Sequence, residues 1–567
     1  MTSDQSHPVF ALSDQLVDEL CAIYPDDATY LGVDGFDDRW PDLSPDGTGG
    51  ALAALREMRG RVEALPPATD RWDDLAIRIA AHDLDRAIAR HERSHHLRNL
   101  NSVYSPVQSM RETFDHMKKD AVAHWEAVVT RLESLDTALG GYRESLEQGR
   151  RLGIAVPIRQ VDEAIRQATV TASEESAFVA FLDEFDETGP TVSGGDQGAE
   201  LRRRLEAAIG KGRHAYGSLV TYLTDTYRGS APAEDAAGRE RYLVEAADIL
   251  GTAPDLDETY RWGWQEVASL RHRMALVAEQ IAPGGGISGA LEVLKTDPAR
   301  SAATPEELVV FLDARISEAL ERLAGSHFDV PEEIRTCDVK LAPVGAPLGA
   351  YYVGPSEDFT RPGAVWWSIE RDQPKPLYDD VSTAYHEGFP GHHLQVGTQI
   401  SLQDRLSRLH RIWVWMSGTG EGWALYAERL MDELGYLDQP DYVFGYLTSQ
   451  MLRACRVVID IGCHLELPIP DDQPFHPGEA WSFELGVEML ERYATLDTPY
   501  AEAEVNRYLG WPGQAISYKI GERYILQLRD ELRSRHGDDF DLRRFHRRVL
   551  EVGPVALDVM REYVLAE

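Results

Sequence analysis

The segment TAYHEGFPGHHLQ, residues 383–395, contains residue types that bind a zinc ion and use it in hydrolysis. A common zinc-hydrolase signature places two histidines four residues apart on one helix, with a glutamate beside the first as general base. Here His386 and Glu387 are followed by Pro390 at the second position, and the next histidines are His392 and His393. On a straight helix His393 would lie about 10.5 Å along the axis from His386, too far to share one ion.

The residues between the histidines predict that this helix is interrupted. Pro390 lacks an amide hydrogen and clashes with the preceding turn, and Gly388 and Gly391 permit unusual backbone conformations. A local bulge that takes up two residues would put His392 in the place of the usual second ligand. The alternative is a surface helix end with two histidines beside a Pro-Gly turn.

A third ligand is expected downstream, because catalytic zinc takes three protein ligands and keeps one position open. The segment SGTGEGWALYAERLMDELGY predicts a buried helix on which Glu421 and Glu428 share one face. Buried carboxylates need a partner, so Glu421 is predicted to bind the metal. The alternative for Glu421 is a carboxylate favoured by the helix dipole. Glu428 is predicted to support a ligand or form a salt bridge.

Two further segments place polar groups on apolar helices. In LRACRVVIDIGCHLEL one stripe carries Arg453, Arg456, Asp460 and His464. This stripe is either a buried ion-pair network or a wall of the binding site in which an arginine such as Arg456 holds a carboxylate. In NRYLGWPGQAISYKIGERYILQLR, Tyr508 and Tyr518 flank a Pro-Gly turn. A phenol near zinc can donate a hydrogen bond to the oxyanion of a tetrahedral intermediate, although a single Tyr more often belongs to the core.

The remaining pattern predicts a mostly α protein with one small β-sheet just ahead of the histidines. Apolar residues at helical spacing predict helices in 75–89, with Ile77, Ala81, Leu84 and Ile88 inward, and in 121–135. Loops are expected near 186–198, 228–240 and 282–289. Strands are expected in 338–344, 350–354 and 363–370. We therefore predict a helical N-terminal lobe, 1–336, and a zinc-binding lobe, 337–567.

Composition limits the classes of function. The 567 residues carry a net charge of −38, from 95 acidic and 57 basic side chains, which argues against nucleic acid or anionic membranes as partners. Four scattered cysteines, no evident secretory signal and no apolar run of membrane-spanning length predict a cytoplasmic protein. The nucleophile elbow, the P-loop and the dinucleotide fingerprint are absent.

Three segments in this order, HEGFPGHHLQ, GEGWALYAERLMDELG and RYLGWPGQAISYKIG, resemble the bacterial family DUF885. The resemblance extends to YYVGPSEDFTRPGAVWW, PDDATYLGVDGFDDRWPDLS and FHRRVLEVGPVALDVMREYV, and so covers nearly the whole chain. The family looks like gluzincins, which are zinc metallopeptidases whose third ligand is a Glu on a later helix. Their relatives include helical, clamshell-shaped peptidases, some with a lengthened signature in which the second ligand follows a Gly.

The resemblance implies roles for individual residues. It places His386, His392 and Glu421 on zinc, and Gly391-His392 favours His392 over His393. It implies Glu387 as general base and Tyr518 as oxyanion donor. Arg507 and Tyr508 would bind substrate, and GAVWWS would be an edge strand that pairs with an extended peptide.

We therefore expect a cytosolic zinc-dependent peptidase that acts on short peptides. Two alternatives stay open. One is a zinc amidase or tailoring hydrolase for a peptide-like small metabolite. The other is a non-catalytic helical binding protein with a degenerate metal site.

Overall fold

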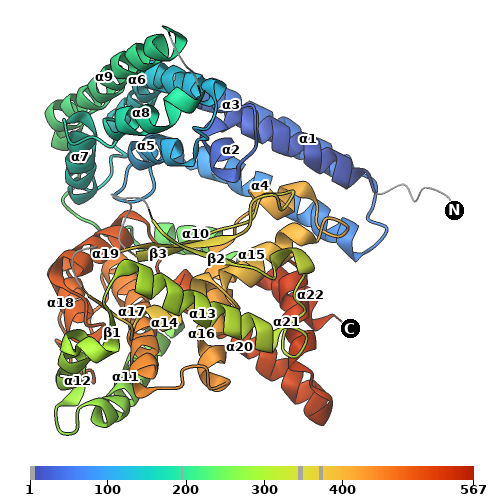
Figure 1. Ribbon diagram of the computed structural model, residues 1–567, viewed down its shortest axis with the longest axis vertical. Coiled ribbons are helices and arrows are strands. Elements are labelled where there is room, and N and C mark those ends of the chain that lie inside the picture. Colours follow the sequence, from blue (N-terminus) through green and yellow to red (C-terminus); the bar gives the residue numbers. More distant parts are fainter. Residues whose placement is uncertain (1–6, 193–195, 343–348, 370–373, 567) are drawn as a thin grey trace. The chain divides into compact units, whose positions relative to one another are not determined.

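The chain divides into two units, each built mainly of helices (Figure 1). The structure is a computed structural model that describes residues 7–192, 196–342, 349–369 and 374–566. The N-terminal unit comprises residues 1–235 and 407–413, and the C-terminal unit comprises 236–406 and 414–567. The boundary predicted from the sequence lies between residues 336 and 337. The helices of residues 236–336 instead belong to the unit that carries the histidine segment, because α11 packs along α17 there.

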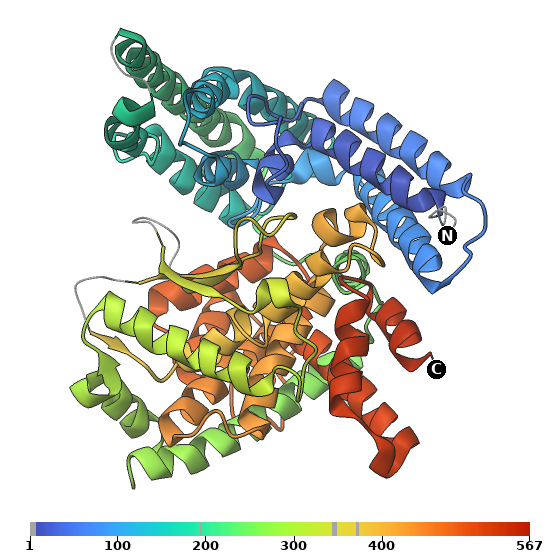
Figure 2. The same ribbon diagram turned by 45° about the vertical axis from the view of Figure 1, so that its right-hand side comes forward.

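In the residues that the structure describes, the N-terminal unit contains helices and no strand (Figures 1 and 2, mainly blue to green). Its core gathers Trp125, Leu132 and Leu139 of α6 against Phe178 and Tyr216. Its elements are α1 (Pro8–Ile23), α2 (Pro25–Leu31), α3 (Pro45–Glu63), α4 (Arg71–Glu92), η1 (His95–Arg98), α5 (Pro106–His116), α6 (Val122–Arg151), α7 (Ile158–Ala172), α8 (Ala180–Val192), α9 (Asp196–Tyr222), η2 (Leu223–Tyr227), η3 (Arg228–Ser230) and η6 (Leu409–Trp413).

The C-terminal unit packs two long pairs of helices, α11 against α17 and α16 against α20. Its helices are α10 (Arg239–Leu250), α11 (Leu256–Ile281), α12 (Gly286–Thr296), η4 (Pro298–Arg300), α13 (Pro305–Leu323), η5 (Glu332–Ile334), α14 (Asp380–Glu387), α15 (His392–Ser401), α16 (Ser417–Glu433), α17 (Pro440–Leu465), α18 (Phe483–Tyr493), α19 (Thr498–Gly510), α20 (Ser517–His536), η7 (Gly537–Asp539), α21 (Leu542–Glu551) and α22 (Leu557–Leu565). Across the described ranges, no helix is both long enough and apolar enough to cross a bilayer.

A three-stranded sheet precedes the histidine segment, in the order β2–β4–β3. Strand β2 (Asp338–Leu341) runs parallel to β4 (Ala364–Ser368), and β3 (Gly349–Val353) runs antiparallel to it. The expectation that GAVWWS is an edge strand is therefore wrong, because both sides of β4 are already hydrogen-bonded. Its burial explains its β-branched and aromatic residues. A second pair joins β1 (Ser301–Ala302) to β5 (Lys375–Pro376).

The prediction of a mostly helical protein with one small sheet is confirmed. Three details differ. Helix α4 buries Leu75, Ile79 and Leu84, whereas Ile77 and Ala81 are only partly buried, because its inward face is rotated from the predicted one. The predicted loop at 186–198 is largely helical, with 193–195 outside the described residues. The loop near 282–289 spans only 282–285.

Helices α16 and α20 approach each other through glycines. A Cβ atom on Gly521 of α20 would overlap the carbonyl oxygen of Gly418 on α16, and one on Gly422 would lie 2.5 Å from the Gly521 backbone. Direct backbone contact of this kind leaves no room for a side chain. It also places Glu421 of α16 and Tyr518 of α20 near the same crossing.

We expect Gly521→Ala to destabilise the protein by about 1–3 kcal/mol, because the new methyl group overpacks this crossing. Differential scanning calorimetry should show a lower melting temperature. Gly289→Ala in α12 is the matched control, since its Cβ would meet only Ala282 Cβ at 3.8 Å. The control should be neutral or stabilising. An unchanged melting temperature for Gly521→Ala would contradict this view of the crossing.

Candidate metal centre

The histidine segment forms two helices separated by a turn, and not one helix with a bulge. Helix α14 ends at Glu387, the turn spans 388–391 and contains the cis Phe389–Pro390 peptide, and α15 begins at His392. The predicted bulge is therefore corrected to a complete break. A Cβ on Gly391 would overlap the carbonyl oxygen of His386, so the close return of the chain requires glycine. The indole of Trp423 donates to the Pro390 carbonyl at 2.9 Å and fixes the turn to α16.

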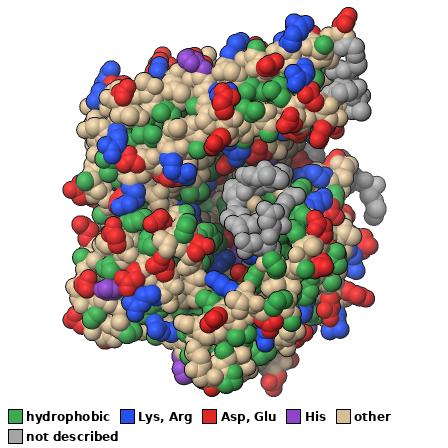
Figure 3. Space-filling model, turned by 60° about the vertical axis from the view of Figure 1, so that its left-hand side comes forward, with side chains coloured by type: hydrophobic (Ala, Val, Ile, Leu, Met, Phe, Trp, Pro, Cys, Tyr) green, Lys and Arg blue, Asp and Glu red, His purple; other side chains and the backbone are tan. Residues whose placement is uncertain are grey.

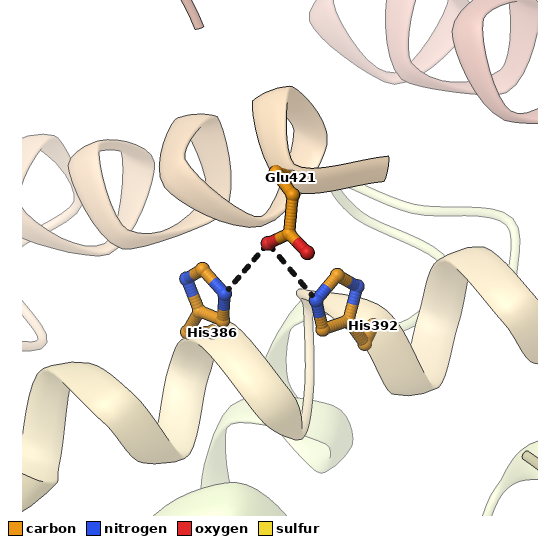
Figure 4. A group of neighbouring side chains, drawn as sticks. All are labelled: His386, His392 and Glu421. Carbon is orange, nitrogen blue, oxygen red and sulfur yellow. Dashed lines mark ion pairs between the residues drawn. The ribbon is translucent and has the colours of Figure 1, made fainter. Parts of the chain in front are cut away.

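This break brings His386 and His392 together. His386 lies in the last turn of α14 and His392 is the first residue of α15, with ring centroids 5.0 Å apart and ring planes at 89°. Glu421 reaches both rings from α16 (Figure 4). Its Oε2 lies 3.5 Å from Nε2 of His386 and 3.6 Å from Nε2 of His392.

The three side chains have the geometry of a small metal site. Their donor atoms all lie within 4.8 Å of one another. Tetrahedral zinc with bonds of about 2.0–2.1 Å separates its ligand atoms by about 3.3 Å, which is close to the two histidine–carboxylate distances. Figure 4 shows the two rings and the carboxylate facing one another. His386, His392 and Glu421 could therefore hold one ion, as the sequence predicts.

Other polar groups orient these histidines. Nδ1 of His386 lies 2.8 Å from Oε1 of Glu428, and Nδ1 of His392 lies 3.2 Å from Oε1 of Gln395. The Glu428 carboxylate also accepts hydrogen bonds from Ser382 and, at 3.3 Å, from Ser449. With Nδ1 occupied on both rings, Nε2 is the atom left for a metal. This is the supporting position predicted for Glu428.

His393 lies outside this group. Its Nδ1 is 3.0 Å from the hydroxyl of Tyr352 and its Nε2 is 2.9 Å from the carbonyl of Ile334. Burial lowers the pKa of His393 to about 4, so the ring is neutral and both nitrogens are used in structural hydrogen bonds. Of the two adjacent histidines, only His392 faces Glu421.

Negative charge is concentrated around the two histidines. Glu387 lies beside them, with Oε1 4.0 Å from Nε2 of His386. Burial raises the pKa of Glu387, while the nearby histidines oppose that effect. Burial also acts to raise the pKa of Glu421, but hydrogen bonds from both histidines hold it well below its usual range. With Glu428, three carboxylates share this site, which favours a bound cation.

Tyr518 lies close enough to Glu421 to be affected by its charge. It is half-buried on α20, and its ring lies 4.8 Å from the guanidinium of Arg456 and 5.9 Å from that of Arg453. Burial, followed by the charge of Glu421, raises its pKa and keeps the phenol protonated. Within the described part of the chain its hydroxyl makes no hydrogen bond. It is therefore available as a donor.

The other predicted substrate-binding residues meet at one carboxylate, that of Glu504. Arg456 Nη2 lies 2.8 Å from it, Arg507 Nη2 lies 3.0 Å away, and the Tyr508 hydroxyl donates to it at 2.5 Å. Tyr508 is only 1% exposed, so it orients Glu504 and does not line an open surface. Arg507 remains partly exposed.

Asp460 and His464, the two C-terminal members of the polar stripe predicted on α17, make structural hydrogen bonds. Asp460 accepts hydrogen bonds from the Tyr242 hydroxyl at 2.8 Å and from the Gly513 amide at 3.0 Å. His464 lies 3.0 Å from the Tyr508 carbonyl and accepts from the Ala237 amide. Both side chains are fully buried. The interpretation as a buried polar network therefore applies to Asp460 and His464, and the interpretation as a wall of the binding site stays open for Arg453 and Arg456.

Sequence reasoning missed three residues that position the histidines, namely Ser382, Gln395 and Trp423. Two of them had a signal, since Ser382 precedes His386 by four residues and Gln395 follows His392 by three, which puts each pair on one helix face. Trp423 had none, because its indole bonds to a backbone atom 33 residues away.

Comparison with known proteins identifies the family. The model of the DUF885 family, described as bacterial proteins of unknown function, matches residues 25–564. The chain belongs to this family. No curated protein matches it significantly.

Two solved structures resemble this member of DUF885 in fold. One is described as a "putative lipoprotein" from Colwellia psychrerythraea, at 22% identity and a TM-score of 0.86, covering 100% of this chain and 99% of that one. The other, from Shewanella oneidensis, is described as a "putative lipoprotein of unknown function", at 17% identity and a TM-score of 0.72, covering 98% and 100%.

We predict that Asp460 makes the stability of this DUF885 protein pH-dependent. Burial raises the pKa of Asp460 to about 7, so the folded state keeps a proton that the unfolded chain has lost above about pH 4. Its contribution to stability is therefore present at low pH and lost as pH rises through 7. Melting temperatures of Asp460→Asn and wild type, measured from pH 5 to pH 8.5, should shift in favour of the variant as pH rises. Parallel curves would contradict the prediction.

Proposed function

We propose that this protein is a zinc-dependent hydrolase that cleaves amide bonds in short peptides, with a ligand set of the gluzincin type. The observation that carries the proposal is the convergence of His386, His392 and Glu421, with Glu387 beside them. Two imidazoles and one carboxylate are a common ligand set of catalytic zinc. The hydrogen bonds that Nδ1 of each histidine makes to the oxygens of Glu428 and Gln395 leave Nε2 of both histidines for the ion.

Zinc held by these three residues would supply Lewis-acid activation of water and of the substrate carbonyl group. Glu387, whose pKa burial raises, is suited to take a proton from the attacking water and deliver it to the leaving amine. Tyr518 keeps its proton and has a free hydroxyl, so it can donate a hydrogen bond to the carbonyl oxygen when that oxygen becomes negatively charged in the tetrahedral intermediate. The overall reaction is hydrolysis. The C–N bond of the amide breaks, the carbonyl carbon gains a hydroxyl group and the nitrogen gains a hydrogen, both from one water molecule.

The charge of the protein favours a small substrate over a nucleic acid or a membrane. The net charge of −38 repels polyanions, and on the face drawn in Figure 3 the basic side chains are interspersed with acidic ones. We also propose a cytoplasmic location, which suits four free cysteines. The lipoprotein descriptions belong to the structural neighbours.

We expect about one zinc ion per wild-type chain by inductively coupled plasma mass spectrometry, after incubation with zinc and desalting. His386→Ala and Glu421→Ala should lose it, because each removes a ligand. His393→Gln is the matched control and should retain zinc, since His393 faces away from the site. Wild-type protein that binds no metal would refute the metal site, and the non-catalytic binding protein would then be the better interpretation.

We expect Glu387→Gln to keep its zinc and lose about 10²–10⁴-fold in the rate of peptide hydrolysis, because the amide cannot accept the proton. Cleavage of a mixed peptide library, followed by mass spectrometry, measures this change. Glu318→Gln on α13 is the control; it removes an equal charge at a site 42% exposed and should leave the rate unchanged.

Two results would redirect the proposal. Equal rates for Glu387→Gln and wild type would remove Glu387 from the mechanism. A zinc-loaded wild type that leaves the whole library intact would exclude the general peptidase and favour the amidase that acts on a peptide-like metabolite.

A further inference from the structure

Of three arginines near Tyr518, two share one carboxylate and the third forms no ion pair with a described residue. Arg456 and Arg507 both pair with Glu504, at 2.8 and 3.0 Å. Among the described residues no carboxylate lies within ion-pair distance of Arg453, which bonds only to Ser449, through its carbonyl at 3.3 Å and its hydroxyl at 2.5 Å. The cluster therefore carries two positive charges that are not compensated within it.

The unmatched charge is accompanied by unmatched hydrogen-bond donors. Arg456 is only 6% exposed, and its Nη1 is buried without a partner, as is Nε of Arg453. A buried guanidinium nitrogen without an acceptor destabilises the fold, because no hydrogen bond replaces the one that it made with water. The two guanidinium groups flank the ring of Tyr518. Because Arg453 and Tyr518 are only half-buried, a ligand can reach this side of the cluster.

This cluster is connected to the metal centre by short contacts. Arg453 bonds to Ser449, Ser449 donates to Glu428 at 3.3 Å, and Glu428 holds His386 at 2.8 Å. Arg453 is also close enough to lower the pKa of Glu387. An anion bound at Arg453 would therefore lie close to the reacting amide of a bound substrate.

We infer that Arg453 and Arg456 form a subsite for a carboxylate of the substrate, so that the preferred substrates are short peptides or peptide-like amides with a free carboxylate near the cleaved bond. The inference rests on the proposed hydrolase function and adds the substrate class. Guanidinium groups bind carboxylates through paired, charge-assisted hydrogen bonds, and the unmatched charge of the cluster is what such a group would neutralise. The carboxylate could be the C-terminus of a peptide or an acidic side chain.

The test is binding of matched peptides to zinc-loaded Glu387→Gln protein, which we expect to bind but not to cleave. The four probes are N-acetyl-trialanine, its C-terminal amide, and that amide with Glu or with Gln at the central position. Isothermal titration calorimetry should show that at least one carboxylate-bearing probe binds on the order of tenfold or more tightly than its neutral partner. The pair that differs tells whether the C-terminus or a side chain supplies the carboxylate.

Arg453→Gln in the same background should abolish this preference while leaving the affinity for the neutral probes nearly unchanged. A purely structural role of Arg453 would weaken acid and neutral probes alike. The control is Arg322→Gln on α13, where the side chain is 68% exposed, and it should keep the preference. The zinc content of each variant is measured in parallel, so that loss of metal is recognised.

The outcomes separate the two claims. If wild type hydrolyses acid and amide peptides equally and both bind alike, the carboxylate subsite is refuted while the hydrolase stands. If no probe is hydrolysed but the acids bind preferentially through Arg453, the subsite stands and the cleavage of short peptides is refuted. If no probe is bound or hydrolysed, both claims are overturned.

Discussion

The pairing of Glu421 and Glu428 with His386 is the interaction on which the rest of the site depends. Both carboxylates come from one face of α16 and reach opposite nitrogens of one imidazole. Carboxylates with so little solvent exposure are costly to desolvate, so they require partners at short distance. The direct contact of α16 with α20 and the bond from Trp423 to the turn hold these partners in place.

The turn between α14 and α15 brings together two histidines that a continuous helix would hold apart. His392 follows His386 by six positions, and no single straight helix can bring two residues at that spacing to one ion. By ending α14 and starting a new helix, the chain points two imidazoles at one carboxylate. The glycine and proline residues of the turn are thus part of the site, because they allow the backbone to return against His386.

The sequence predicts which residues form the site better than it predicts the backbone path that positions them. The spacing of Glu421 and Glu428 on one helix face requires only helical periodicity, and the structure places both carboxylates at His386. The choice between His392 and His393 depends on where α15 begins, and the hydrogen bonds of His393 to Tyr352 and Ile334 bridge distant parts of the chain. For the same reason the central position of β4 was not predictable, since strand order depends on long-range pairing.

The site has two sides of opposite charge. Around the histidines the carboxylates outnumber the cationic groups. Near Tyr518 there are three guanidinium groups, and only two of them pair with a glutamate, Glu504. Tyr518 lies where the two sides meet, close to Glu421 and flanked by Arg453 and Arg456. A cation on the first side and an anion on the second would each reduce a desolvation cost that the folded chain otherwise bears alone. A substrate that bridges both, with its amide at one side and its carboxylate at the other, would be oriented by this charge division before any bond is broken.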